Sequence, residues 1–235
     1  AIPAPSAKLL WKDLHTQDSV REEGKSKTEK VHISLTAEGV YEGRPWTCAF
    51  EFYYANEESF YCRLKSASNC EGPTIKVPEG ARKHSVVFLP PMSGLAGREY
   101  RKEQGEISVL IGEGQTAQVL RNLCWRLFTL EDKGAWELLC KRVHSLFNVR
   151  LNEPTYIKER SELILTSSAG RGCQQVLLLL SFLLANPGSV LLLDEPDAHL
   201  EILRQRDVYN LLTQVAEGNG SQIVAASHSE VVLQE

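Results

Sequence analysis

The fold of this chain is decided by one stretch, Ser189-Val190-Leu191-Leu192-Leu193-Asp194-Glu195-Pro196-Asp197-Ala198-His199-Leu200. Its apolar residues 190–193 predict a buried parallel strand, because such strands are short and apolar on both faces. Asp194 and Glu195 follow at the carboxyl end of the strand, which is where ligands bind in open α/β sheets. Neighbouring carboxylates on an extended chain face opposite ways. One can therefore hold a hydrated Mg²⁺ while the other reaches a water molecule.

A glycine-containing segment and an apolar helix precede this strand. Residues 165–175 read Leu-Thr-Ser-Ser-Ala-Gly-Arg-Gly-Cys-Gln-Gln and lead directly into the apolar run 176–184. Small residues and glycines ahead of a helix leave free N–H groups and a positive dipole end, which favour phosphate. The apolar run is too short to span a bilayer, so it predicts a buried core helix. Residues 186–188, Asn-Pro-Gly, end that helix.

A second helix and a second strand follow the carboxylates. Apolar residues recur with helical period from 200 to 215, and glycines at 218 and 220 end the helix. Residues 222–227 then predict another buried strand, with His228 at its carboxyl end. Strand, helix and strand form one right-handed βαβ unit. Asp194, Glu195 and His228 are therefore expected to share one edge of one sheet.

In this order, the motifs resemble the ATP-binding-cassette (ABC) class of ATPase, with a signature loop opening a helix, a Walker B strand, a D-loop and a switch histidine. The transporter signature is usually Leu-Ser-Gly-Gly-Gln, whereas residues 168–175 read Ser-Ala-Gly-Arg-Gly-Cys-Gln-Gln. The D-loop, 195–200, reads Glu-Pro-Asp-Ala-His-Leu. Both are more similar to the soluble branch that includes RecF, the SMC proteins and the overcoming-lysogenisation-defect ATPases. The resemblance covers about 70 residues at the C-terminal end.

The resemblance implies ATP and Mg²⁺ as ligands and assigns catalytic roles by position. Asp194 would bind Mg²⁺ through water, since this ion keeps water ligands beside carboxylates. Glu195 would orient or deprotonate the attacking water. His228 would contact the γ-phosphate and sense its loss. His199 is predicted to be a helix-face histidine, and Arg171 a surface arginine that could also reach phosphate.

The resemblance also implies a second ATPase protomer, because ABC heads sandwich nucleotide between two subunits. The signature residues Ser168, Gly170 and Gly172 would bind the γ-phosphate of the ATP held by the other protomer of a homodimer. Asp197, in the D-loop, would cross the dimer interface. Gln175 and the residue before it would anchor the start of the signature helix.

The rest of the chain fits the head of such an ATPase. Residues 1–90 predict an antiparallel β meander, with strands near 31–36, 46–54 and 59–64, followed by a buried strand at 85–89. Two amphipathic helices, near 120–128 and 136–147, lie ahead of the signature loop. The predicted fold is therefore α/β, an ABC-type P-loop NTPase head. It comprises a β-rich subdomain (1–90), a helical lobe (91–164) and the ATPase core (165–235).

No convincing Walker A loop occurs in this sequence. Residues 24–26, Gly-Lys-Ser, match the end of G-x-x-x-x-G-K-[ST], but the first glycine falls on Ser19 and no apolar strand precedes it. Residues 107–117 match the Rossmann pattern G-x-G-x-x-A after a short apolar strand, but the acid expected about 20 residues on does not end a second strand. Both stretches are predicted to be loops. The interpretation is a C-terminal portion of a larger ATPase head, or one half whose P-loop is supplied in trans.

The glutamine of the family's Q-loop has no clear counterpart. It should follow a core strand at the entrance to the helical lobe, where residues 90–95 read Pro-Pro-Met-Ser-Gly-Leu. Gln104 and Gln115 are the candidates nearest to that position. The role stays unassigned.

The composition of the chain limits the binding partners and cellular compartments that are expected for it. The chain has 235 residues, a net charge of −4 and no strong basic excess, although a local basic patch could lie within a mildly acidic total. Its six cysteines form no C-x-x-C pair, which favours reduced thiols in a cytoplasmic protein over disulfides or zinc. No signal peptide or transmembrane run is recognisable, so no membrane partner is expected.

Three classes of function remain. The first is an ATP-hydrolysing, dimerising motor or switch that acts in DNA repair or phage defence, with DNA or a nuclease as further partner, as the resemblance implies. The second is a non-hydrolysing interaction or scaffold module that keeps the cassette shape without its own P-loop. The third, a transporter cassette, is disfavoured by the D-loop and by the long β-rich front section.

Overall fold

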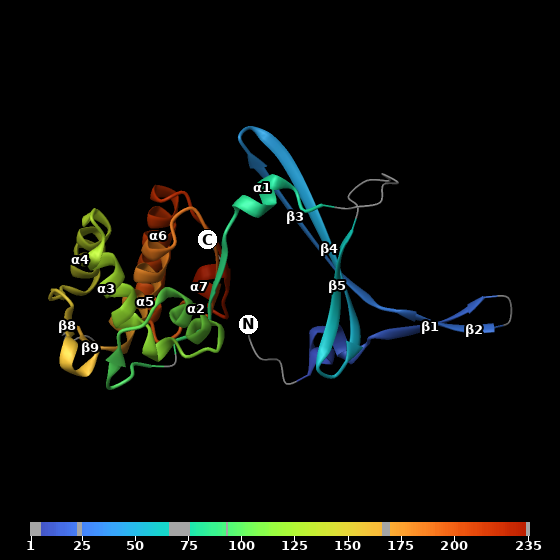
Figure 1. The fold of residues 1–235 in the computed structure, drawn as a ribbon, viewed down its shortest axis with the longest axis horizontal. Helices are drawn as coiled ribbons and strands as arrows, with labels where there is room; N and C mark the ends of the chain where they lie inside the picture. Colours follow the sequence, from blue (N-terminus) through green and yellow to red (C-terminus); the bar gives the residue numbers. More distant parts are fainter. Residues whose placement is uncertain (1–5, 23–24, 66–75, 93, 166–169, 234–235) are drawn as a thin grey trace. The chain divides into compact units, whose positions relative to one another are not determined.

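The computed structural model describes residues 6–22, 25–65, 76–92, 94–165 and 170–233, with the side chains of 20–27, 232 and 233 excepted. The chain divides into two compact units, Pro3–His84 and Ser85–Glu235 (Figure 1). None of the described helices combines the length and the apolar character that a bilayer span requires.

The first unit is built on an antiparallel sheet with strand order β3-β4-β5. Its strands are β3 (His32–Tyr41), β4 (Arg44–Asn56) and β5 (Ser59–Lys65), which confirms the predicted meander. Glu42 and Gly43 join β3 to β4 with φ angles of 50° and 72°. Two positive φ angles in a two-residue connection are typical of the hairpin turns that match strand twist.

Several short elements complete this unit. They are η1 (Ala7–Leu10), η2 (Lys12–Leu14), α1 (Glu79–Lys83), and the antiparallel pair β1 (Gln17–Glu22) and β2 (Lys25–Lys30). Lys25 and Ser26 therefore belong to a strand, and the prediction of a loop was wrong for them. Gly24, the centre of that Walker A look-alike, lies outside the described residues. A phosphate loop opens a helix, whereas β2 continues as strand to Lys30.

The two faces of the β3-β4-β5 sheet differ in chemistry, because side chains alternate along each strand. One face is apolar and carries Trp46, Phe50 and Phe52 of β4. Helix α1 packs at the Trp46 end, where a Cβ on Gly80 would lie 2.3 Å from Trp46 Cδ1. The opposite face is polar and includes Glu51 and Tyr53.

The second unit contains a parallel sheet with strand order β11-β10-β6. Its strands are β6 (Val86–Leu89), β10 (Val190–Asp194) and β11 (Gln222–Ala226). Both strands of the predicted βαβ unit are therefore confirmed. Helix α6 (Ile202–Gly218) connects β10 to β11.

Helices pack around α5 (Arg171–Ala185), which is almost entirely buried (Figure 1). Its neighbours include α3 (Leu120–Thr129), α4 (Gly134–Phe147) and α6, and the first two confirm the predicted helical pair. Fully buried leucines from these helices and from β10 form the core: Leu123, Leu127, Leu139, Leu177, Leu178, Leu180, Leu183, Leu191 and Leu212. The remaining elements of this unit are α2 (Gln104–Gly112), η3 (Thr116–Gln118), β7 (Glu99–Tyr100), β8 (Thr155–Ile157), η4 (Lys158–Arg160), β9 (Glu162–Ile164) and α7 (Glu230–Leu233).

One face of the parallel sheet is covered and the other is open. Leu191 and Leu193 of β10 face the helices and are 1% and 5% exposed. On the other face, Val86 of β6 and Val224 of β11 are 61% and 58% exposed. The prediction that 85–89 and 222–227 form buried strands was wrong for one face of the sheet, because the described helices pack against the other face.

A second prediction was wrong at residues 107–112. This stretch lies in helix α2 rather than in a strand or a loop, with Ile107 and Ile111, four residues apart, turned into the core. Gly112 is the last residue of that helix. A Rossmann fingerprint needs a strand before its first glycine, so this match does not mark a dinucleotide site.

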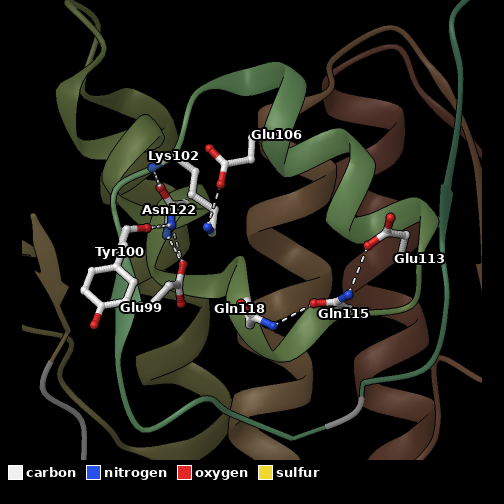
Figure 2. A network of polar contacts seen from close by, with 8 residues as sticks. All are labelled: Glu99, Tyr100, Lys102, Glu106, Glu113, Gln115, Gln118 and Asn122. Atoms are coloured by element: carbon white, nitrogen blue, oxygen red, sulfur yellow. Dashed lines mark hydrogen bonds and ion pairs between the residues drawn. The ribbon is translucent and has the colours of Figure 1, made fainter.

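A buried carboxylate fixes the short strand β7 to the start of α3 (Figure 2). Glu99 accepts hydrogen bonds from the backbone N–H groups of Arg121 (2.9 Å) and Asn122 (2.7 Å), and from Asn122 Nδ2 (2.7 Å). Asn122 also donates to the Tyr100 carbonyl and accepts from the Lys102 N–H. Burial raises the pKa of Glu99, against the opposing effect of these hydrogen bonds. The network caps α3 inside the protein, where unpaired N–H groups would be costly.

Candidate functional site

The carboxyl edge of the parallel sheet presents two consecutive acidic residues. Asp194 ends β10, and Glu195 follows it with φ of 45°, a conformation that is uncommon outside glycine. The Glu195 N–H donates to the carbonyl of Ala226, the last residue of β11, over 2.8 Å. This hydrogen bond continues the ladder beyond the strand and fixes the point at which the chain turns away from the sheet.

The structure brings the predicted catalytic residues together at this edge. The Glu195 Oε1 lies 3.7 Å from the Nε2 of His228. The side chain of His228 is 93% exposed and that of Glu195 is 45% exposed. Asp194 is partly buried beside them. A solvent-accessible acid next to an imidazole can orient or deprotonate a water molecule.

Asp197, two residues beyond Glu195, is held by hydroxyl groups from the same unit. Its Oδ1 accepts hydrogen bonds from the Ser227 hydroxyl at 2.6 Å and from the Tyr209 hydroxyl at 3.4 Å. The Ser229 N–H donates in turn to Ser227 Oγ at 2.9 Å. Burial raises the pKa of Tyr209 to about 12, and the Asp197 charge adds to this effect. The network joins the turn after β10 to the turn after β11. In the second turn, Ser227 and Ser229 flank His228.

Sequence reasoning missed Ser227 and Tyr209 as parts of the site. Ser227 was assigned only to the end of a strand, and Tyr209 falls among the polar positions of a helix. The available signal was the position of Ser227, one residue beyond the carboxyl end of β11 and next to His228. Hydroxyl groups at that edge of a parallel sheet are well placed to contact the neighbouring strand's loop.

The predicted signature residues lie at the start of α5. Gly170 precedes the first residue of the helix, and Gly172 lies in its first turn, whereas Ser168 lies outside the described residues. A Cβ on Gly172 would approach the carbonyl oxygen of His199 to 3.1 Å, which explains why this position suits glycine. His199 itself has φ of 66°. The signature helix and the D-loop are therefore in close contact.

Gln175 strengthens this contact from inside the protein. Its side chain is buried, and Nε2 lies 3.4 Å from the carbonyl oxygen of Pro196, in the D-loop. Its Oε1 has no hydrogen-bond partner among the described residues. We predicted that Gln175 anchors the start of the helix. Its hydrogen bond instead links the helix to the D-loop.

A hollow of about 360 Å³ opens beside the signature glycines. It is lined by residues of the helix start, the D-loop end and the start of α6, together with Phe147. Arg171 and Arg204 contribute positive charge there. The Arg204 guanidinium is held by the Leu146 carbonyl at 2.7 Å and lies 5.1 Å from the centre of the Phe147 ring. Burial also raises the pKa of the adjacent Cys173 thiol to about 11, so this cysteine stays a neutral lining group.

The two Q-loop candidates lie in different places. Gln115 precedes η3, where it donates to Glu113 at 3.0 Å and accepts from Gln118 at 2.7 Å (Figure 2). The next residue, Thr116, donates its hydroxyl to the Pro91 carbonyl at 3.2 Å, directly after β6. Gln104 starts α2 and accepts from Arg126 instead. Of the two, Gln115 is next to the loop that follows a core strand.

Comparisons with known proteins give three similarities. A family model described as "AAA domain, putative AbiEii toxin, Type IV TA system" matches residues 136–234. Two relatives, both called "Xylose import ATP-binding protein XylG", come from Yersinia pseudotuberculosis serotype I (strain IP32953) and Yersinia pestis. Each is 27% identical to this chain over 164 residues, which cover 69% of this chain and 29% of the relative. A crystal structure of the SmcHead bound to the C-winged helix domain of ScpA matches with a TM-score of 0.46 at 12% identity, over 86% of this chain and 68% of that chain.

The family match contains α5, the strand β10 with the two carboxylates at its end, the loop that follows β10, and His228. The chain spans 29% of the length of the two Yersinia relatives. Through α5, β10, α6 and β11, the chain is therefore similar to P-loop ATPases of the ABC class.

Proposed function

We propose that the second unit forms the Walker B, D-loop and switch-histidine part of an ATP-hydrolysing site. The observation that carries this proposal is the position of Glu195. Its carboxylate lies 3.7 Å from His228 Nε2, at the carboxyl edge of two parallel strands and directly after Asp194. In this role Glu195 positions or deprotonates the attacking water, and His228 contacts the γ-phosphate.

Asp194 fits the binding of Mg²⁺ through water. Mg²⁺ is held by one or two carboxylates together with waters and substrate phosphates, rather than by a closed protein cage. Among the described residues, no group of three or more histidine, cysteine or acidic side chains is close enough to form such a cage. A partly exposed carboxylate at the strand end agrees with the open type of site. When bound, the ion would neutralise charge on the phosphates of ATP.

The strand arrangement supports a phosphate loop that comes from another segment. Among the described strands, β11 has β10 as its one neighbour, and Val224 on its open face is 58% exposed. Parallel sheets are normally covered on both faces by helices. A strand paired with β11, followed by a helix over the open face, would place its connecting loop at the edge that holds Asp194 and His228.

The signature residues are proposed to act on a second protomer. The hollow beside Gly170 and Gly172 is lined by α5, α6 and the D-loop, and Asp194, Glu195 and His228 are not among its lining residues. A γ-phosphate bound there would therefore belong to an ATP held elsewhere, as in a homodimer that sandwiches nucleotide. In this arrangement Asp197 would cross the dimer interface, while the hydroxyl groups of Ser227 and Tyr209 hold its carboxylate.

The wider role is proposed from the family resemblance. It is an ATP-driven switch in the cytoplasm that acts in DNA repair or phage defence, with DNA or a nuclease as partner. A non-hydrolysing scaffold is the second candidate. One observation favours it: in the described part of residues 85–235, no loop with the Walker A pattern joins a strand to a helix.

Calorimetric titration with Mg-ATP, together with a phosphate-release assay, separates these two candidates. The assay compares three forms of the full-length protein: the unmodified form, Glu195→Gln, and Glu217→Gln. The last variant is a control near the distal end of α6. Loss of a general base is expected to lower hydrolysis by roughly 10²- to 10⁴-fold while binding is retained. Hydrolysis that is equal in the three proteins would overturn the role of Glu195. Absence of both ATP binding and ATP hydrolysis in the unmodified full-length protein would establish the non-hydrolysing scaffold instead.

A further inference from the structure

A stacked tyrosine pair lies on the polar face of the β3-β4-β5 sheet. Tyr53 of β4 and Tyr61 of β5 are direct register partners, with ring centroids 5.2 Å apart and an angle of 30° between the rings. Tyr61 is 58% exposed, although aromatic rings are usually at least half buried. The pair therefore offers an accessible flat ring surface to solvent.

Cationic side chains surround this pair. The Lys30 ammonium lies 4.6 Å from the centre of the Tyr53 ring, and the Arg63 guanidinium lies 5.8 Å from it. The side chains of Arg63 and Lys65 are 61% and 54% exposed. We call this surface the Tyr53 face and define it by these residues: Lys30, His32, Tyr53, Tyr61, Arg63 and Lys65.

One acidic residue, Glu51, lies beneath the cations of the Tyr53 face and is buried. Glu51 is 7% exposed and accepts a hydrogen bond from Arg63 Nε at 2.7 Å, with Lys65 Nζ at 3.6 Å and His32 Nδ1 at 3.1 Å. The Arg63 hydrogen bonds lower the pKa of Glu51 to about 2, with His32 as the next contributor. The carboxylate therefore organises the cations while it stays hidden from a ligand.

The charge of the Tyr53 face is opposite to that of the chain. Lys30, Arg63 and Lys65 carry three positive charges against the single negative charge of Glu51, whereas the whole chain has a net charge of −4. Glu38 projects from the same sheet face but lies at the other end of β3, opposite Thr47. The positive charge is thus concentrated around the exposed rings.

We infer that the Tyr53 face binds single-stranded nucleic acid, with a base stacked on Tyr61 and backbone phosphates against Lys30, Arg63 and Lys65. Single strands are bound without sequence preference where exposed aromatic rings stack on bases and a basic surface follows the backbone. A duplex keeps its bases inside the helix, so an exposed flat ring would find no base to stack on. The inference deepens the DNA-linked part of the proposed function, but it requires no ATP.

Fluorescence anisotropy tests the inference in the absence of nucleotide, with a labelled 15-mer of deoxythymidine, a 15-mer of uridine and a 15-base-pair duplex as probes. Tyr61→Ala is expected to weaken single-strand binding by about 5- to 150-fold, the range for loss of one stacked base. Phe60→Ala is the matched control, because Phe60 precedes Tyr61 on β5 and points to the other sheet face at 43% exposure. It is expected to leave binding unchanged.

Lys65→Gln provides a second test that does not depend on the aromatic ring. It is expected to reduce the slope of log K against log salt concentration by about 0.7, the value for one phosphate contact on a single strand. Equal binding by the duplex, or equal losses in Tyr61→Ala and Phe60→Ala, would overturn the inference. Absence of single-strand binding at low salt would also overturn it, and would leave the proposal for Glu195 intact. Tighter binding of either 15-mer would assign DNA or RNA as the source of the strand.

Discussion

The hydroxyl of Ser227 donates a hydrogen bond to Asp197 Oδ1 over 2.6 Å, so the residue before His228 is fixed to the loop that follows β10. This short contact links two loops that leave neighbouring strands of one sheet. It means that the positions of His228 and Asp197 depend on each other. A substitution in either loop is therefore expected to affect the position of the other loop.

Ser227→Ala is expected to lower the free energy of unfolding by about 1–2 kcal/mol, because a partly buried carboxylate loses a hydroxyl donor. Asp197→Asn should cost a similar amount, and the double variant should cost less than the sum of the two. Urea unfolding measures all three. Ser108→Ala, an exposed serine on α2, is the control and should change stability little. Strict additivity of the first two changes would show that the hydrogen bond contributes nothing.

The two signature glycines are expected to respond differently to alanine. A Cβ at Gly172 would lie 3.1 Å from the His199 carbonyl oxygen, whereas a Cβ at Gly170 meets nothing within 4 Å. Gly172→Ala should therefore destabilise the second unit by roughly 1–3 kcal/mol, the usual cost of overpacking. Gly170→Ala should leave the urea midpoint nearly unchanged. A reversal of this order would contradict the described contact between α5 and the D-loop.

The stability of the first unit is expected to fall with acid through Glu51. The Arg63 hydrogen bonds lower its folded-state pKa to about 2 from 4.5, so its contribution is complete above pH 4.5 and is lost as the pH falls towards 2. The guanidinium midpoint, followed by circular dichroism, should decrease across this window. Glu51→Gln should flatten the decrease, whereas Glu38→Gln on the same face should not. Identical slopes in both variants would exclude Glu51 as the titrating group.

Asn122→Ala is expected to destabilise the second unit by about 3 kcal/mol, because it removes two hydrogen bonds donated by a buried amide and leaves part of a buried carboxylate unpaired. The amide donates to Glu99 and to the Tyr100 carbonyl. Gln118→Ala, in the same view in Figure 2, removes a hydrogen bond between exposed side chains and should cost less than 0.5 kcal/mol by the usual rule for surface positions. Thermal unfolding compares the two variants. Similar losses of unfolding free energy in the two variants would mean that the Glu99 network does not stabilise the fold.

The carboxyl edge of the sheet could be predicted from sequence because its signals are local. An apolar run ending in Asp194 and Glu195, a helix with clear period and a second apolar run ending near His228 leave few arrangements open. The hydroxyl partners of Asp197 could not be predicted, since they come from 12 and 30 residues away and depend on tertiary packing.

Two local patterns misled the prediction for a physical reason. Residues 107–111, Ile-Ser-Val-Leu-Ile, have high strand propensity, but the i and i+4 isoleucines pack into the core and hold a helix. The hairpin of β1 and β2 has the opposite problem, because its strands read Gln-Asp-Ser-Val-Arg-Glu and Lys-Ser-Lys-Thr-Glu-Lys and carry almost no apolar signal. The hydrophobic pattern of the sequence therefore does not predict the pairing of these two strands.

Among the described strands, β11 pairs only with β10, and its other edge has a consequence for the behaviour of the protein in solution. The strand reads Gln-Ile-Val-Ala-Ala, without charge or proline, and such edges are templates for association with other chains. Light scattering should therefore rise with concentration, and a lysine in place of Val224 should suppress this rise. The edge that we propose to receive the strand of a phosphate loop would therefore also favour self-association of the protein in solution.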